Sequence, residues 1–146
     1  MTAFDELAKE KGQFLEDQTV SVTGRIEAIR AQGKGLIFID LVGDGHKLQV
    51  LGNKKNYEGD WELLYTSLRR GDIIGADGAP GRSNSGELSV LPKLIISLSP
   101  CMHMIPKNNQ KGNEGAIIMQ KDTRYRQRYL DLIVNSQVRK IFQTRN

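Results

Sequence analysis

Alternating apolar and polar residues predict a series of short strands in the middle of the chain. From Val20 to Ala28 every second residue is apolar or glycine and the residues between are polar, which is typical of a half-buried strand. Two more apolar segments, 36–41 and 47–51, are separated by the turn Gly43-Asp44-Gly45. The three segments together predict an antiparallel meander.

The spacing of apolar residues then becomes helical. Residues 61–68 place a tryptophan and two leucines on one face, and Asp60 stands where an N-cap is expected. Arg69 and Arg70 suit the last turn of a helix, and Gly71 suits the position just beyond it. We therefore expect a helix that runs from Trp61 to Arg70.

Two more strands follow this helix. They are expected over residues 72–76 and from Glu87 to Leu98, the second with a kink or bulge near Pro92. Three strands, a helix and two strands predict an OB-fold, a five-stranded Greek-key barrel with a helix between strands three and four. An SH3-like barrel is the alternative, but it does not normally hold a helix of this length at that point.

Helical patterns flank the barrel segment. Thr2–Lys11 is expected to form a short N-terminal helix, and apolar spacing predicts further helices over 125–133 and 138–142, with a cap at residue 135 or 136 between them. The expected parts of the chain are an N-terminal helical extension (1–18), an OB-fold domain (19–104), a linker rich in Gly, Asn and Lys (105–122) and a C-terminal helical segment (123–146).

Composition places the chain among reduced globular domains. It is 38% hydrophobic and 26% charged, and no apolar run approaches the roughly 18 residues that span a bilayer. The first residues lack the basic and apolar stretches of a signal peptide. A single cysteine, Cys101, excludes an internal disulfide. We expect a cytoplasmic protein without a membrane segment.

The positive charge lies almost wholly at the C-terminal end. Residues 1–120 hold 14 Lys and Arg against 15 Asp and Glu, whereas residues 121–146 hold seven against two. The overall charge of +4 therefore says little about the barrel. Recognition of a nucleic acid by the barrel has to be argued from particular side chains.

Strand alternation indicates which side chains those are. If Ile37, Ile39 and their equivalents face the core, then Arg25, Phe38 and Gln49 lie on the outer surface of the first three strands, where OB-folds bind oligonucleotides. An outward aromatic ring stacks on bases, and the amide of a glutamine offers a donor and an acceptor. A frame shifted by one residue is the alternative: Phe38 then lies in the core, and Arg25 and Gln49 are ordinary surface residues.

Other candidate sites are weaker. His46 and His103 are far apart and have no partner ligands, and Cys101, between Pro100 and Met102, lacks the setting of a catalytic thiol. The glycine-rich segments 33–35 and 81–86 lack the spacing of a phosphate-binding loop. No combination of residues suggests a catalytic centre, and we expect no metal or cofactor site.

The sequence resembles the N-terminal region of lysyl-tRNA synthetases, which are class II aminoacyl-tRNA synthetases. Aspartyl and asparaginyl enzymes share the early motifs, but the spacing of the last one is similar to that of the lysyl enzymes. The motifs are Ser21-Val22-Thr23-Gly24-Arg25-Ile26, Phe38-Ile39-Asp40-Leu41, Lys47-Leu48-Gln49-Val50, Leu68-Arg69-Arg70-Gly71-Asp72, Gly86-Glu87-Leu88-Ser89-Val90 and Arg124-Tyr125-Arg126-Gln127-Arg128-Tyr129-Leu130-Asp131-Leu132.

The resemblance implies that the barrel binds a tRNA anticodon. The matching positions for contacts to bases are Arg25, Phe38, Gln49 and Glu87, the last of these mainly on the resemblance, although a carboxylate there can accept from an N–H of a base. It further implies a parent enzyme that joins lysine to its tRNA with ATP and Mg²⁺, acts as a homodimer and has other synthetases among its possible partners. Residues 123–146 are expected to be the start of the catalytic domain, whereas the ATP site, the lysine pocket and most of the dimer interface are expected outside these 146 residues. Residues 107–120 depart from the family pattern because they are longer and more polar. An aspartyl-type or asparaginyl-type domain, or an OB-fold that binds proteins, remains the alternative.

Overall fold

The computed structural model describes residues 11–103, 105–106 and 120–145. Its contacts divide the chain into two compact units, with the division between Met102 and His103. The helix expected over Thr2–Lys11 lies outside the described residues except for its last residue, and so does most of the expected linker. The four-part division of the chain therefore stays a prediction.

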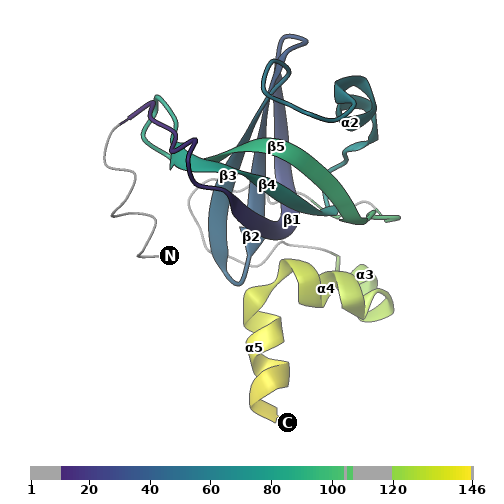
Figure 1. Cartoon of the computed structure of the whole chain (residues 1–146). Coiled ribbons are helices and arrows are strands. Elements are labelled where there is room, and N and C mark those ends of the chain that lie inside the picture. The colour runs from purple at the N-terminus through teal and green to yellow at the C-terminus, as the bar shows by residue number, and fades with distance from the viewer. Residues whose placement is uncertain (1–10, 104, 107–119, 146) are drawn as a thin grey trace. The chain divides into compact units, whose positions relative to one another are not determined.

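The first unit is a closed five-stranded barrel, as the sequence pattern predicts (Figure 1). The strand order around the barrel is β1-β2-β3-β5-β4, in which only β3 and β5 run parallel. A helix between β3 and β4 completes the OB-fold. The elements are β1 (Val20–Gln32), β2 (Leu36–Gly43), β3 (His46–Asn53), α2 (Trp61–Ser67), β4 (Ile73–Arg82) and β5 (Leu88–Ser99).

Strand β1 is longer than expected and contains a bulge. Its first half pairs with β4 and its second half with β2, and the register with β2 shifts between Ile26 and Ala28. An extra residue in one strand reverses the alternation of side chains beyond it. Ala28, the last residue of the alternating segment, therefore pairs with Asp40 on the outer face.

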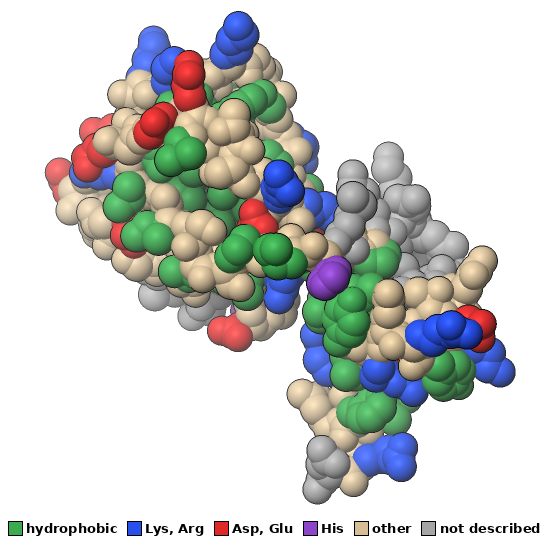
Figure 2. Space-filling model, turned by 90° about the vertical axis from the view of Figure 1, so that its right-hand side faces the viewer, with side chains coloured by type: hydrophobic (Ala, Val, Ile, Leu, Met, Phe, Trp, Pro, Cys, Tyr) green, Lys and Arg blue, Asp and Glu red, His purple; other side chains and the backbone are tan. Residues whose placement is uncertain are grey.

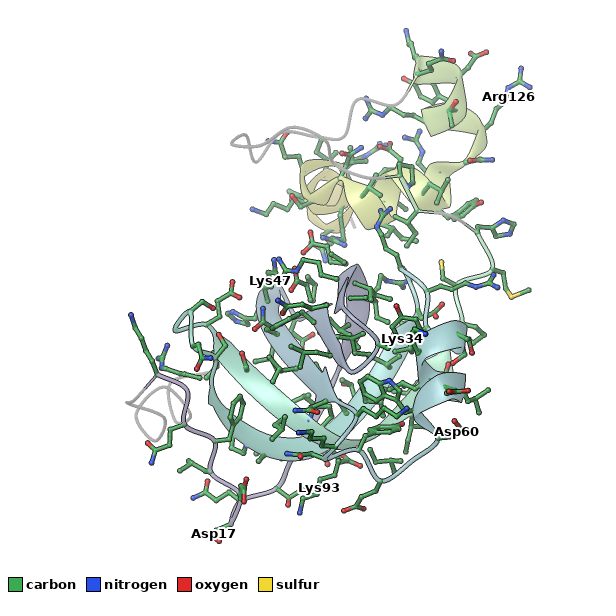
Figure 3. The ribbon with its side chains drawn as sticks, turned by 90° about the horizontal axis from the view of Figure 1, so that it is seen from above. Asp17, Lys34, Lys47, Asp60, Lys93 and Arg126 are labelled. Carbon is green, nitrogen blue, oxygen red and sulfur yellow. The ribbon has the colours of Figure 1, made fainter. Side chains whose placement is uncertain are left out.

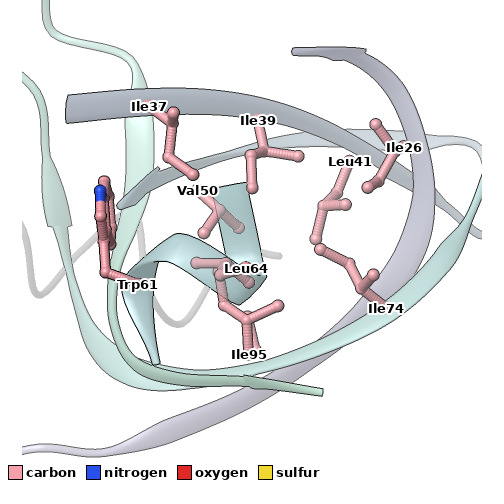
Figure 4. Packing of buried hydrophobic residues seen from close by; sticks show 10 residues of the cluster. Ile26, Ile37, Ile39, Leu41, Val50, Trp61, Leu64, Ile74 and Ile95 are labelled. Carbon is pink, nitrogen blue, oxygen red and sulfur yellow. The ribbon is translucent and has the colours of Figure 1, made fainter. Parts of the chain in front are cut away.

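The core fills the barrel and the space beneath α2 (Figure 4). Leu64 points from α2 toward Val50 and Ile95, whereas Ile26 and Leu41 lie at the other end of the cluster. The indole N–H of the buried Trp61 donates to the Lys34 carbonyl at 2.9 Å. The buried cluster comprises Ile26, Ile37, Ile39, Leu41, Val50, Trp61, Leu64, Ile74, Ala76 and Ile95.

Helix α2 begins where the sequence predicts and ends earlier. Asp60 accepts hydrogen bonds from the backbone N–H groups of residues 62 and 63 at 3.0 and 3.1 Å, which confirms the N-cap. The helix ends at Ser67, so the placement of Arg69 and Arg70 in its last turn is wrong. Leu68 is already extended, and the Arg69 backbone N–H donates at 2.8 Å to the buried Asp72 carboxylate instead of to a helical carbonyl.

The second unit consists of three helices: α3 (Lys121–Arg126), α4 (Arg128–Val134) and α5 (Ser136–Arg145). The helix expected over 125–133 is broken at Gln127, which has φ −116° and ψ 63°. A second break at Asn135 lies where a boundary is expected.

A buried carboxylate organises the second unit. Asp131 accepts hydrogen bonds from Arg124 Nε at 3.1 Å, from Arg128 Nη1 at 3.4 Å and from Asn135 Nδ2 at 2.5 Å. Burial of this carboxyl opposes its ionisation, but the hydrogen bonds from Asn135 and Arg124 and the two arginine charges outweigh burial and lower its pKa below the ordinary 3.8. The guanidinium of Arg128 also lies 5.1 Å from the ring centre of Tyr125.

Candidate nucleic-acid interface

The outer face of β1, β2 and β3 is arranged in rows of paired residues. Phe38 of β2 lies between Arg30 of β1 and Leu51 of β3, and in the next row Asp40 lies beside Gln49. Residues that pair across antiparallel strands project from the same face. An aromatic ring, a cation, a carboxylate and an amide are therefore neighbours on one surface.

Phe38 faces outward. Its neighbours Ile37 and Ile39 are 2% and 0% exposed, whereas Phe38 itself is half-buried. The alternative frame, in which Phe38 belongs to the core, is therefore excluded. The ring presents an accessible apolar surface beside polar groups, which is the arrangement that stacks on a base.

A surface pocket of about 350 Å³ lies beside this ring. Its lining combines the outer face of β1–β3 with the β4–β5 loop and the residue just before β5. The lining residues are Arg30, Ala31, Gln32, Phe38, Gln49, Ser85 and Glu87. Of the four expected site residues, the pocket brings together Phe38, Gln49 and Glu87.

The amide of Gln49 is held at both of its ends. Its Nε2 donates to Glu87 Oε2 at 2.6 Å, and its Oε1 accepts from the Ser89 hydroxyl at 3.1 Å. Gln49 is 6% exposed and Ser89 0%, whereas Glu87 is exposed. A buried amide with both ends satisfied has one orientation.

Asp40 organises two cations at the edge of the same surface. Its carboxylate oxygens lie 2.8 Å from Arg30 Nη2 and 3.0 Å from Lys47 Nζ. The Asp40 side chain is buried, although it projects from the outer face, because the two basic side chains cover it. The side chain of Arg30 remains 57% exposed and leaves N–H groups for a phosphate or a base.

Arg25 lies elsewhere on the barrel. It pairs with Val42 of β2 and Ile73 of β4, two outward positions beyond Phe38 along β2. Its Nη1 donates to the Gly71 carbonyl at 2.7 Å, and it does not line the pocket. The contact with Gly71 ties β1 to the segment before β4.

Sequence reasoning missed Arg30 and Ser89. If strict alternation is counted forward from Val20 along β1, Arg30 is placed inside the barrel. The bulge after Ile26 instead turns Arg30 outward. Counting back from the turn at residues 33–35 would have paired Arg30 with Phe38 correctly. Ser89 gives no such local signal, because it reaches Gln49 only through the parallel pairing of β3 with β5.

Two of the other candidates, His103 and Cys101, make contacts within the chain. The ring of His103 packs at 6.3 Å from that of Tyr129, and the backbone N–H of Cys101 donates to Asp72. No group of three or more His, Cys, Asp or Glu that could hold a metal ion occurs among residues 11–103, 105–106 and 120–145. None of the described helices is long and apolar enough to cross a membrane.

Basic side chains form no single patch on the face of the barrel shown in Figure 2. Those on the face shown in Figure 2 lie among acidic and apolar ones. In Figure 3, Lys34 lies on the same side as α2 and Asp60, whereas Lys47 lies away from them. Charge alone does not mark a binding surface, whereas the Phe38 pocket combines several groups suited to one ligand.

Comparison with known proteins places the barrel in a family. The family model for tRNA anticodon domains, described as an OB-fold nucleic acid binding domain, matches residues 20–98, which is more than half of the chain. The chain belongs to this family. The match extends from the first residue of β1 almost to the end of β5, so the anticodon-type OB-fold comprises the whole barrel.

Three relatives of this OB-fold chain are named lysine–tRNA ligases. A lysine–tRNA ligase of Cladosporium cladosporioides is 38% identical over 99% of the chain, and a probable cytoplasmic lysine–tRNA ligase of Encephalitozoon cuniculi is 36% identical over 96%. A lysine–tRNA ligase of Moorella thermoacetica is also 36% identical, over 94%. The chain spans only 24–27% of the length of these three relatives.

Proposed function

We propose that this chain is the anticodon-binding domain of a lysine–tRNA ligase and that it binds the anticodon loop of lysine tRNA at the Phe38 pocket. The observation that carries the proposal is the convergence of Phe38, Gln49 and Glu87 on one pocket of about 350 Å³. The match to tRNA anticodon domains and the names of the relatives support it.

Each side chain has a distinct part in this proposal. The ring of Phe38 stacks on an unpaired base, which is worth about 1–3 kcal/mol. The second N–H of the Gln49 amide donates to the base edge, and the carboxylate of Glu87 accepts from it. Arg30, held by Asp40, contacts a neighbouring phosphate or the base plane.

The activity of the whole enzyme belongs to the same proposal. A full-length protein would join lysine to its tRNA with ATP and Mg²⁺ and act as a homodimer. It would work in the cytoplasm, the location that the name of the Encephalitozoon relative gives for that protein. Because the chain spans only 24–27% of the length of its relatives, we assign ATP and Mg²⁺ to the remainder of such an enzyme and expect these 146 residues to bind RNA without aminoacylating it.

Titration with anticodon stem-loops tests the proposal. The chain is titrated with a fluorescent stem-loop that carries the anticodon UUU, and with stem-loops that carry aspartate, asparagine or scrambled anticodons. We expect the UUU loop to bind most tightly. Its affinity should fall between about 50 and 200 mM salt, because phosphate contacts release counterions.

Three results would contradict the proposal. A preference for the aspartate or asparagine anticodon would assign the domain to one of those enzymes. Equal, weak and salt-independent binding of all loops would favour a barrel that binds proteins. Detectable ATP–pyrophosphate exchange by the 146-residue chain would place catalysis within it.

A further inference from the structure

We propose that Ser89 is a positioning residue that sets the choice between uracil and cytosine in the Phe38 pocket by fixing the amide of Gln49. This inference rests on the proposed function, since it concerns how the pocket reads a base. Ser89 does not line the pocket, and it acts through Gln49.

The closure of the barrel puts Ser89 in place. Strands β3 and β5 pair in parallel over two residue pairs, Gln49 with Ser89 and Val50 with Val90. The Ser89 side chain is completely buried, and its hydroxyl oxygen lies 3.1 Å from Gln49 Oε1 and 3.0 Å from the Glu87 carbonyl oxygen. The hydroxyl carries a single hydrogen, and the Glu87 carbonyl also accepts the Ser83 backbone N–H at 3.0 Å, so we assign that hydrogen to Gln49 Oε1.

Of the two side chains that bond the Gln49 amide, Ser89 is the one whose hydrogen bond persists unchanged when a base binds. Glu87 is exposed, and its carboxylate is the group that an N–H of a base would engage. When a base binds, Glu87 divides its hydrogen bonds between Gln49 and the base. The bond from Ser89 to Gln49 Oε1 lies behind the pocket, so a bound base does not compete for it.

The orientation of the amide decides which base edge fits. With Oε1 turned to Ser89, the pocket offers an amide N–H next to an accepting carboxylate, which matches the adjacent carbonyl and imide N–H of uracil. With the amide reversed, two acceptors face the base, and these match the two N–H groups of the cytosine amino group. Loss of the Ser89 hydroxyl should therefore weaken the preference for uracil.

Binding of matched stem-loops measures this preference. The probes are the UUU stem-loop and three loops that each carry one U→C change. The readout is the Kd of a U→C loop divided by the Kd of the UUU loop, taken at the position where the wild-type chain discriminates most. We expect Ser89→Ala to reduce this ratio about 3- to 10-fold, the scale of one hydrogen bond. Ser97→Ala is the matched control, because Ser97 is an exposed serine of the same strand outside the pocket.

A double-mutant cycle separates positioning from a general structural effect. In a Gln49→Ala background, Ser89→Ala should leave the ratio unchanged, because the group through which it acts is absent. If Ser89→Ala fails to fold, Ser89→Cys replaces it as a near-isosteric variant with a poor donor.

Each outcome has a separate meaning. A wild-type chain that does not distinguish the loops contradicts the proposed function. A wild-type chain that does distinguish them, with an unchanged ratio in Ser89→Ala or Ser89→Cys, overturns the role of Ser89 alone. A ratio that falls equally with and without Gln49 also overturns it.

Discussion

Arg30 lies directly opposite Phe38 across β1 and β2. This pairing depends on the bulge between Ile26 and Ala28, which turns Arg30 to the outer face. Asp40 then fixes the guanidinium at 2.8 Å. A stacking ring and a cation oriented by a buried carboxylate thus stand together at the pocket, although the charges of the barrel nearly balance.

Replacement of Phe38 by alanine should weaken RNA binding without unfolding the barrel. The half-buried ring offers a stacking surface, so loss of about 1–3 kcal/mol is expected for the UUU stem-loop, or about 5- to 150-fold in Kd. Fluorescence anisotropy and thermal melting measure the two effects. Leu94→Ala, at a 39% exposed leucine on β5 outside the pocket, is the control. A collapse of the melting temperature with unchanged affinity of the folded molecules would show that the ring is structural.

The two arginines of β1 should behave differently on substitution. Arg30→Ala should weaken all stem-loops about equally and reduce the slope of log Kd against log salt by about one, because one phosphate contact is lost. Arg25→Ala should mainly lower the melting temperature, since its guanidinium donates to the Gly71 carbonyl. Salt-dependent titrations of both variants check this. If the slope changes more for Arg25→Ala than for Arg30→Ala, the phosphate contact is made by Arg25 and the assignment to Arg30 is wrong.

Local patterns predicted most of the barrel. Alternation located the first three strands, and Asp60 marked the start of α2, because these features depend on residues close together in the sequence. The outward position of Phe38 followed from the same alternation. The end of α2 did not follow, because the Asp72 carboxylate that accepts the Arg69 backbone N–H is buried and also accepts the backbone N–H of the distant Cys101.

The candidate site was only partly predictable for a similar reason. Gln49 and Phe38 lie on adjacent strands of a meander, so alternation places them on one surface. Glu87 and Ser89 reach Gln49 through a parallel pairing of strands 40 residues apart, which no local pattern encodes. The direction of Arg30 depends on a bulge that one sequence does not reveal.

Two glycines of β4 should differ in their tolerance of alanine. Gly78 lies opposite Pro92 at a register shift, and a Cβ atom there would overlap the Leu91 carbonyl oxygen. Gly78→Ala should therefore lower the free energy of unfolding by about 1–3 kcal/mol or more. At Gly75 a Cβ atom would meet Leu98 at 3.7 Å, an ordinary contact, so Gly75→Ala should change stability little. Urea denaturation of both variants checks this, and equal losses would contradict the close approach at Gly78.

The C-terminal helices should lose stability in acid through Asp131. The pKa of this carboxyl is lowered in the folded state, so the unfolded chain takes up the proton first as the pH falls below about 4. The contribution of Asp131 to the free energy of unfolding is therefore complete near neutral pH. It declines below pH 4 and is lost below the folded-state pKa. Helical circular dichroism during thermal melting, recorded from pH 7 down to about pH 2.5, measures the decline.

Asp131→Asn identifies the group responsible. The variant should melt earlier than the wild-type chain at pH 7, because Arg124 and Arg128 lose a charged partner inside the unit. It should also show less further loss in acid. Asp122→Asn is the matched control, since that carboxylate is 87% exposed and lies 3.9 Å from Arg126. A similar loss in acid for the wild-type chain and Asp131→Asn would assign the pH dependence to other carboxylates.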